Sequence, residues 1–261
     1  MIELNTVYCM DIFDLCNHLK NQSMDMILCD LPYGVTECAW DKQIPIEPMW
    51  ETFKRILKPH GVIALTATQP FSSKLVMSNL EWFKYEWVWV NYSRPTMFIH
   101  AKNCPLRVHE NVLIFSQGVI NHKNCTDNRM NYFPQMDIGK PYRRNNTLRK
   151  LSSVVGKRPS HREFLHINDG ERYPKDVLEI NESNNSLNHP SQKPIALFEY
   201  LILTYTQPGD VVFDPCVGSG TTALAARGCD RNYIVGDKDE NFARITKERL
   251  AAPYTPKLIK D

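Results

Sequence analysis

Short apolar segments of strand length alternate with helix-like segments along most of the chain. Residues 24–29, 61–66 and 211–213 are three such apolar runs, and residues 194–206 and 221–227 have the pattern of helices. Strands that are separated by helices favour a largely parallel sheet, because each crossover lays a helix against one face of it. The sequence therefore predicts an α/β fold with a doubly wound sheet.

The composition is that of a globular chain with a substantial core. Hydrophobic residues make up 43% of the 261 residues, yet no apolar run approaches the roughly 18 residues of a membrane span. The N-terminus lacks the basic-then-apolar pattern of a signal peptide. The 8 cysteines stand singly at irregular spacing, which disfavours zinc and disulfide frameworks. We therefore expect a cytoplasmic protein with no membrane span and no metal site.

A basic, loop-rich stretch interrupts the regular pattern. Between residues 123 and 175 there are twelve Lys or Arg residues against five Asp or Glu residues, interspersed with aromatic side chains. A solvated surface explains many charged stretches, but this mixture also suits phosphate contact and base stacking. We expect an insert at 119–185 between fold segments 1–118 and 186–252, followed by a tail at 253–261. Its candidate DNA contacts are Arg143, Arg144, Arg149, Lys157 and Arg158.

Four carboxylates mark the ends of strand-like runs. Asp11, Asp30, Asp214 and Asp237 each fall at or just beyond the end of such a run. In doubly wound sheets, ligands bind where the loops meet at the carboxyl ends of the strands. This regularity predicts one composite site that draws on both ends of the chain.

The turn at residues 218–220, Gly-Ser-Gly, joins a strand to a helix. Glycines let the backbone approach a ligand closely, and the start of a helix offers unpaired amide groups. The dinucleotide pattern Gly-x-Gly-x-x-Gly is absent, because position 223 is Ala. Asp237 closes the next strand, where nucleotide-binding folds hold ribose hydroxyls. The alternatives are a purely structural turn and a helix cap at Asp237, although Asp239 is better placed for capping.

The turn at residues 30–33, Asp-Leu-Pro-Tyr, has a different chemistry. Pro32 fixes its own φ and biases Leu31 toward extended backbone, which lets the Leu31 carbonyl point into a site. Asp30 and that carbonyl can accept the two hydrogens of an exocyclic amine, while Tyr33 can stack on the attached ring. The alternative is an ordinary strand-end turn with Asp30 as a cap.

The two turns, in this order and with a basic insert between them, resemble the β-class DNA amino-methyltransferases. These enzymes transfer a methyl group from S-adenosylmethionine to adenine N6 or cytosine N4. The resemblance covers residues 5–250, including the family's circularly permuted order of amine turn, target-recognition region and cofactor turn. The segment at 189–194, His-Pro-Ser-Gln-Lys-Pro, is similar to the family's His-Pro-Thr-Gln-Lys-Pro, whose Lys helps to hold the methionine carboxylate of the cofactor. The Val-His-Glu-Asn segment at 108–111 is also family-like.

The resemblance implies a Rossmann-like, seven-stranded doubly wound sheet, circularly permuted, with an inserted target-recognition domain. It implies methyl transfer to adenine N6 of a base flipped out of the duplex, since the cytosine-N4 enzymes typically carry Ser where this chain has Asp30. The implied catalytic residues are Asp30, Leu31, Pro32 and Tyr33. The implied cofactor-binding residues are Asp11, Asp30, Ser191, Lys193, Asp214, Cys216, Gly218, Ser219, Gly220, Thr221 and Asp237.

Two departures from the family pattern leave alternatives open. Leu31 replaces the usual first Pro, and Cys216 stands where the family often has Phe against the cofactor. A catalytically weak DNA-binding homologue therefore remains an alternative. Cytosine-N4 methylation, the other reaction of the same family, is the nearest rival. A cytosine-C5 enzyme with a Pro-Cys nucleophile fits poorly, because Cys216 lies inside the cofactor turn. A glutamine- or RNA-directed methyltransferase is a further alternative, although the protein-glutamine enzymes carry the two turns in the opposite order.

The implied partner is double-stranded DNA. The resemblance places such a chain in a bacterial or phage setting, associated with the nucleoid in the cytoplasm. A homodimer and a cognate restriction endonuclease remain open as further partners.

Overall fold

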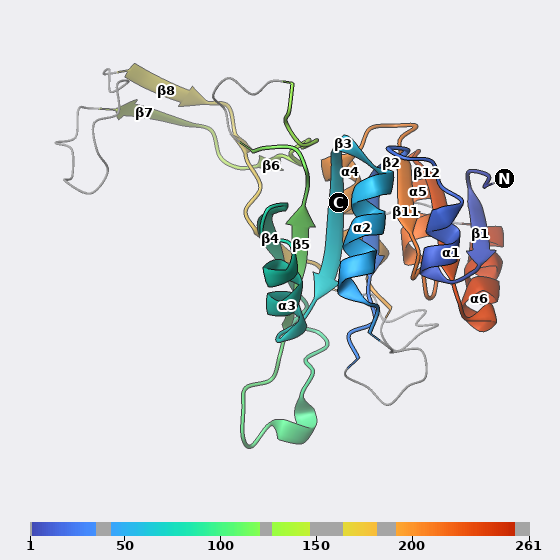
Figure 1. Ribbon diagram of the computed structural model, residues 1–261. Helices are drawn as coiled ribbons and strands as arrows, with labels where there is room; N and C mark the ends of the chain where they lie inside the picture. The colour runs from blue at the N-terminus through green and yellow to red at the C-terminus, as the bar shows by residue number, and fades with distance from the viewer. Residues whose placement is uncertain (1, 35–42, 121–126, 147–163, 182–191, 254–261) are drawn as a thin grey trace. The chain divides into compact units, whose positions relative to one another are not determined.

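The chain forms two compact units in the computed structural model. The larger unit comprises Met1–Phe133 and Asp176–Asp261, and the smaller unit is Pro134–Lys175. Figure 1 shows the helices and strands of both. The structure describes residues 2–34, 43–120, 127–146, 164–181 and 192–253.

The larger unit is a layered α/β structure. Its strands are β1 (Thr6–Cys9), β2 (Met24–Asp30), β3 (Leu57–Ala67), β4 (Phe83–Val90), β5 (His109–Phe115), β10 (Val177–Glu179), β11 (Val211–Asp214) and β12 (Asn232–Asp237). Its helices are α1 (Ile12–Asn17), α2 (Ile46–Ile56), α3 (Phe71–Ser78), the 3-10 helix η1 (Phe98–His100), α4 (Ile195–Tyr205), α5 (Thr221–Gly228) and α6 (Glu240–Ala251).

The strands of this unit form one sheet in the order β1-β12-β11-β2-β3-β5-β4-β10. Neighbouring strands run parallel along β1, β12, β11, β2 and β3. Strand β5 is antiparallel to both of its neighbours, β3 and β4. The predicted α/β class with a largely parallel sheet is confirmed. The sheet has eight strands rather than the expected seven, because β10 adds an edge strand parallel to β4. With three residues, β10 is too short to stand out as an apolar run.

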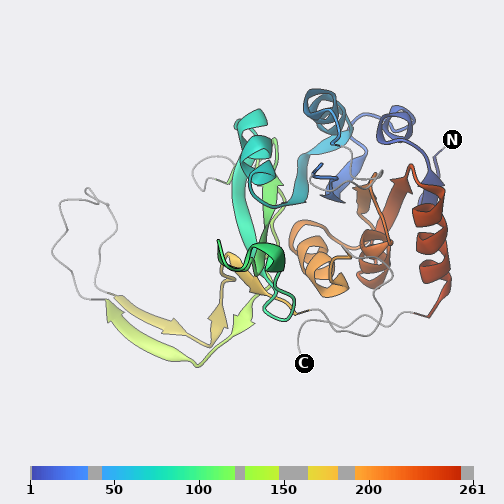
Figure 2. The ribbon, with the colours of Figure 1, turned by 90° about the horizontal axis from the view of Figure 1, so that it is seen from below.

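Each face of the sheet supports its own hydrophobic core. Side chains alternate between the two cores along each central strand, so that Met26 and Leu28 of β2 face one core while Ile27 and Cys29 face the other. One core includes side chains of α4, α5 and α6, and the other includes side chains of α1, α2 and α3. Figure 2 shows these two sets of helices on opposite faces of the sheet. The continuous apolar character of β2 follows from burial on both faces.

Local sequence signals explain where several helices begin. Asp11 caps α1 by accepting a hydrogen bond from the amide of Phe13, at 2.9 Å. Asp239 caps α6 in the same way through the amide of Asn241, at 2.8 Å. Asp239 therefore performs the capping role that the sequence favoured for it over Asp237.

The smaller unit is a pair of two-stranded antiparallel ribbons. Strand β7 (Tyr142–Asn146) pairs with β8 (Phe164–Asn168), and β6 (Asp137–Ile138) pairs with β9 (Glu171–Arg172). The guanidinium of Arg172 lies 4.7 Å from the centre of the Tyr142 ring and donates to backbone carbonyls of this unit. This unit is shorter than the insert expected at 119–185. Residues just outside it pack into the larger unit, as the burial of Met130 and the pairing of β10 show.

No helix in the described ranges is long and apolar enough to cross a membrane. Within the same residues, no group of three or more His, Cys, Asp or Glu side chains could hold a metal ion.

Gly220, in the turn that precedes α5, has a backbone conformation and a close neighbour that disfavour any side chain. Its φ is +91°, and an added Cβ would lie 2.9 Å from the Cγ2 atom of the buried Thr246. Thr246 donates to the Gly218 carbonyl at 3.0 Å and has little freedom to move away. We expect Gly220→Ala to lower the free energy of unfolding by more than about 2 kcal/mol, since it combines backbone strain with overpacking.

Gly209→Ala is the matched control, because Gly209 has a φ of +87° but no atom within 4 Å of an added Cβ. It carries the backbone strain alone, about 1 kcal/mol. Urea denaturation of both variants measures the difference. Equal losses would contradict a packing role for Gly220.

Candidate active site

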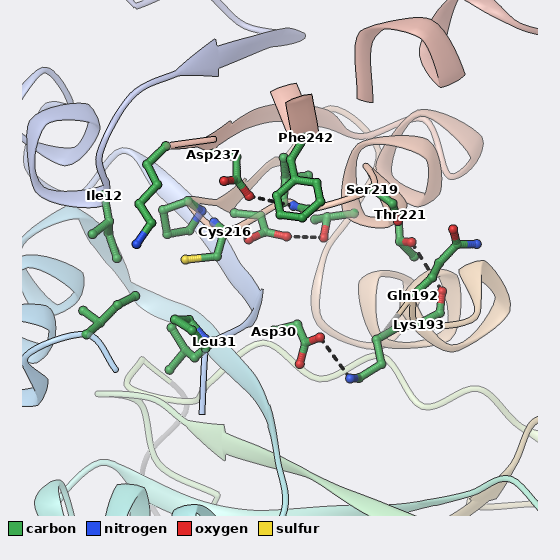
Figure 3. A pocket seen from close by; sticks show the side chains of 18 of the residues that line it. Ile12, Asp30, Leu31, Gln192, Lys193, Cys216, Ser219, Thr221, Asp237 and Phe242 are labelled. Atoms are coloured by element: carbon green, nitrogen blue, oxygen red, sulfur yellow. Dashed lines mark hydrogen bonds and ion pairs between the residues drawn. The ribbon is translucent and has the colours of Figure 1, made fainter. Parts of the chain in front are cut away.

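A cavity of about 230 Å³ opens at the carboxyl edge of the sheet. Asp11, Asp30, Asp214 and Asp237 all line it, from the ends of four neighbouring strands or just beyond them. The four carboxylates that the sequence placed at strand ends thus share a single cavity. Figure 3 shows its two sides, with Asp30 and Lys193 on one and Asp237 with the glycine turn on the other.

The turn at 218–220 forms one side of the cavity. Gly218 has a φ of +53°, and no atom lies within 4 Å of an added Cβ, so its backbone faces open space. Asp237 accepts the amides of Gly218 and Asp239, at 3.0 and 2.9 Å. Burial raises the pKa of the Asp237 carboxyl, and these two amides offset part of that increase. Asp237 therefore fixes the turn while its remaining lone pairs face the cavity.

Asp214 lies at the base of the same turn and is almost fully buried. It accepts the amide of Cys216 at 3.0 Å and the hydroxyl of Thr222. Burial raises the pKa of Asp214 to about 7, although these hydrogen bonds and the Cys29 thiol act in the opposite direction. Asp214 thus changes its protonation state near neutral pH.

Asp30 stands on the other side of the cavity and is held by three donors. Its Oδ2 atom accepts from the Lys193 ammonium at 2.9 Å, and its Oδ1 atom accepts from the Tyr33 hydroxyl at 3.0 Å. The Thr66 hydroxyl also donates to Oδ1. A carboxylate has about four lone-pair positions, so Asp30 keeps one acceptor position on Oδ2.

Glu110 adds a second carboxylate to this group. It lies 3.2 Å from the Lys193 ammonium and 3.5 Å from the Tyr33 hydroxyl. Burial alone would lower the pKa of Lys193, but Asp30, Tyr33 and Glu110 raise it well above its usual value. Burial and the Asp30 charge likewise raise the pKa of Tyr33 far above its usual value, so the hydroxyl keeps its proton and donates it. One ammonium between two carboxylates gives the cluster a net charge of −1.

The register of three strands explains this cluster. Asp30 at the end of β2 pairs with Thr66 of β3, and Ala67 of β3 pairs with Asn111 of β5. Because β5 runs in the opposite direction, it begins at the edge where β2 and β3 end. Glu110 therefore reaches the same edge as Asp30, although it stands at the start of its strand.

The sequence missed part of this site. Thr66 ends a strand as Asp30 does, which was an available signal, and Glu110 belongs to the family-like segment at 108–111. The apolar walls come from Ile12, Ile44, Phe198, Val217 and Phe242. Figure 3 shows the Phe242 ring beside Asp237. The remaining unforeseen lining residues are Gln192, Pro215, Thr222 and Lys238.

Most of the expected site residues meet at this cavity. Besides the four aspartates, it is lined by Leu31, Pro32, Tyr33, Lys193, Cys216, Gly218, Ser219 and Thr221. Gly220 does not line it but begins α5, where it packs on Thr246. Arg143 and Arg144 are exposed on β7 of the smaller unit. Ser191, Arg149, Lys157 and Arg158 lie outside the described residues.

Comparison with known proteins shows which class of protein combines this fold and this cavity. A family model described as DNA methylase (N6_N4_Mtase) matches residues 24–248. The fold and site define an S-adenosylmethionine-dependent methyltransferase. More specifically, the chain belongs to the N6/N4 family of DNA amino-methyltransferases.

Relatives of known name match nearly the whole chain. The Type II methyltransferase M.HpaI of Haemophilus parainfluenzae is 28% identical over 94% of this chain and 74% of its own length. The Type II methyltransferase M1.MboII of Moraxella bovis is 25% identical over 93% of this chain and 95% of its own length.

Solved structures share the fold at low sequence identity. The crystal structure of the M1.HpyAVI-SAM complex has a TM-score of 0.59 at 20% identity, covering 94% of this chain and 98% of that one. The PvuII DNA methyltransferase (cytosine-N4-specific) has a TM-score of 0.64 at 16% identity, covering 94% of this chain and 86% of that one. Identities this low support a common fold alone.

The cavity fits the chemical groups of S-adenosylmethionine. Asp11 and Asp237 retain lone pairs for amine or hydroxyl donors. Apolar side chains such as Phe242 and Val217 can cover a purine ring. The open backbone at Gly218 allows close approach, and the buried Lys193 ammonium offers a partner for a carboxylate.

Asp214 gives a prediction about stability and pH. Its pKa is about 7 in the folded protein against an ordinary value of 3.8. Between these values the folded state binds a proton that the unfolded state has lost, so stability falls as pH rises from about 4 to 7. Asp214→Asn removes this dependence. We expect the wild type to lose a few kcal/mol more than the variant between pH 5 and pH 8.

Denaturant unfolding at the two pH values measures the effect. Asp14→Asn, on an exposed position of α1, controls for the loss of a carboxylate. If the free energy of unfolding depended on pH in the same way in wild type and Asp214→Asn, the raised pKa of Asp214 would be refuted.

Proposed function

We propose that this protein transfers a methyl group from S-adenosylmethionine to adenine N6 of a flipped base in double-stranded DNA. The observation that carries the proposal is the Asp30 carboxylate, which shares one cavity with the turn at 218–220. A carboxylate accepts amine hydrogens better than the Ser that the resemblance associates with cytosine-N4 enzymes. Both adenine N6 and cytosine N4 are exocyclic amines, so the choice of adenine rests on the family's preference for Ser at this position in the cytosine-N4 enzymes.

Asp30 is organised to receive an amine. Three donors fix the orientation of its carboxylate, and one lone-pair position on Oδ2 remains available. One amine hydrogen binds there, and the Leu31 carbonyl accepts the other. Both hydrogen bonds draw the nitrogen lone pair out of ring conjugation, so that it can attack the sulfonium methyl group. The C–S bond would break as the N–C bond forms, S-adenosylhomocysteine would leave, and the amine proton would pass to Asp30 or to water. Tyr33 offers a ring for stacking on the base.

Glu110 gives the group around Asp30 its net negative charge. If Lys193 paired with Asp30 alone, its ammonium would neutralise that carboxylate in a buried site. Sharing the ammonium with Glu110 leaves a net charge of −1 beside the nitrogen, which becomes positive as the methyl group arrives. Glu110 thus acts as a positioning residue through Lys193.

The other side of the cavity suits the cofactor. S-adenosylmethionine supplies an electrophilic methyl group on a sulfonium. Asp237 is assigned to the ribose hydroxyls and Asp11 to the adenine amine. The Lys193 ammonium has three N–H donors, of which two face Asp30 and Glu110, and the third is available for the methionine carboxylate.

The smaller unit is assigned to target recognition. Its β7–β8 ribbon carries exposed Arg143 and Arg144, and two-stranded ribbons are one means of reading a DNA groove. Arg149, Lys157 and Arg158 belong to the same basic insert at 119–185. The strand order supports circular permutation, because β11 and β12 from the end of the chain lie between β1 and β2.

The relatives suggest a biological setting. M.HpaI and M1.MboII are named Type II methyltransferases. We assign this chain to the same role of modifying sites in bacterial DNA, with a cognate restriction endonuclease as the partner class.

Asp30→Ala tests the proposed chemistry. We expect methyl transfer to fall at least about 10²-fold, because the acceptor that organises the amine is gone. Binding of S-adenosylmethionine, measured by calorimetry, should be largely retained, and Asp14→Ala should behave as wild type. Tritiated-methyl transfer measures the rate, and mass spectrometry of digested DNA identifies the base. N4-methylcytosine as the product would replace the adenine assignment, and turnover close to wild type would exclude Asp30 from the chemistry.

Glu110→Gln tests the shared ammonium. The variant removes one negative charge while keeping the size of the side chain, so that Lys193 neutralises Asp30. We expect the single-turnover rate to fall roughly tenfold, or about 1.4 kcal/mol, with little change in cofactor affinity. Glu51→Gln, on an exposed position of α2, is the control. An unchanged rate, or a loss explained by a lower melting temperature, would reject the positioning role.

A further inference from the structure

The segment between β4 and β5, residues 91–108, projects from the edge of the sheet that carries the cavity. β4 is parallel to β3 in the sheet, and β5 begins where these strands end, so the connection leaves from the carboxyl edge. Figure 1 shows this connection, with η1 at its tip, on the side toward which the β3 arrowhead points. We call residues 91–108 the β4–β5 loop.

The β4–β5 loop exposes large apolar side chains. Ile99 is 94% exposed, Phe98 64% and Tyr92 61%, with Met97 beside them at 36%. Contiguous exposed apolar side chains of this size commonly mark a surface that another molecule covers. Nothing in the described part of the larger unit covers them.

The charge of the loop is uniformly positive. Arg94, Lys102 and Arg107 lie within it, and there is no Asp or Glu between residues 91 and 109. A surface of this charge complements a polyanion. It also opposes the pairing of two copies through the same surface, since like charges would then face each other.

Hydrogen bonds hold the apolar tip in place. Thr96 and Arg107 exchange backbone hydrogen bonds of 2.8 and 3.2 Å across the loop, and the amide of Asn91 donates to Val108 at its base. Met97 adopts a φ of +72°, which is uncommon for a residue with a side chain and marks local strain. The loop thus presents Phe98 and Ile99 on an ordered support.

We infer that the β4–β5 loop is a second DNA-contacting element, separate from the basic insert. Its cations contact phosphates, and Phe98 and Ile99 pack against the bases next to the target. Apolar side chains that enter the stack help to separate base steps, and a flipped base leaves a gap that they can fill. The inference rests on the proposed function, since it requires a DNA substrate whose target base leaves the stack.

A double variant, Phe98→Ala with Ile99→Ala, tests this inference. The control is Met77→Ala with Leu80→Ala, which removes side chains that are 69% and 58% exposed near the end of α3, toward the opposite edge of the sheet. The substrate is an oligonucleotide duplex containing the site found by modified-base sequencing of DNA from an expressing host. A second duplex carries a mismatch opposite the target base, which makes that base easier to extrude.

On the paired duplex, we expect the loop variant to methylate about tenfold more slowly than the control, and the mismatch should recover most of that loss. With 2-aminopurine at the target position, the fluorescence increase on binding should be smaller for the loop variant. Lys102→Ala should reduce the slope of log affinity against log salt by about one.

The outcomes separate this inference from the proposed function. If the wild type methylates no DNA, the proposed function fails. If the wild type is active and the loop variant matches the control on both duplexes, only the inference fails. An equal loss on paired and mismatched duplexes would also overturn it. So would a change of oligomeric state in light scattering with unchanged methylation, which would assign the loop to contacts between copies.

Discussion

The buried ammonium of Lys193 is the interaction on which the arrangement of the site depends. Lys193 and Asp30 are 163 positions apart in the chain, yet their charged groups lie 2.9 Å from each other. An ammonium that is 8% exposed is costly unless anions surround it, so the fold must bring carboxylates to it. Asp30 and Glu110 meet this requirement, and the Thr221 hydroxyl donates to the Lys193 carbonyl at 3.3 Å. One residue thereby connects the amine turn, the start of β5 and the start of α5.

The strand order explains how segments from the two ends of the chain meet at Lys193 and Asp30. β11 pairs with β2, so the turn that follows β11 lies beside the turn that follows β2, although one comes from each end of the chain. Parallel strands also deliver their carboxyl ends to one edge, which gathers Asp30, Asp214 and Asp237 without long loops. The antiparallel β5 contributes Glu110 from the start of a strand instead. Mixed strand direction therefore supplies the second carboxylate that a fully parallel sheet would not bring to this edge.

The sequence predicted the features that depend on short-range pattern. Alternating strands and helices indicated the α/β class, and carboxylates at strand ends indicated the shared cavity. The contacts of Thr66 with Asp30 and of Glu110 with Lys193 depend instead on which strands are neighbours and in which register, and no local pattern gives that information. The edge strand β10 gains its stability from β4 rather than from its own three residues. The raised pKa of Asp214 likewise depends on burial by residues from several elements.

The distribution of charge in the larger unit favours entry of a neutral base. The cluster of Asp30, Glu110 and Lys193 has a net charge of −1, and its one remaining ammonium donor is assigned to the cofactor carboxylate, so a further anion such as a phosphate would be repelled. The β4–β5 loop, at the same edge, is positive and complements the phosphates of the proposed DNA substrate. If the loop holds a duplex by its backbone as we infer, both charge distributions favour an uncharged nucleobase as the group that enters the cavity. In the proposed reaction, the amine of that base donates to Asp30, whose negative charge is only partly offset by the ammonium that it shares with Glu110.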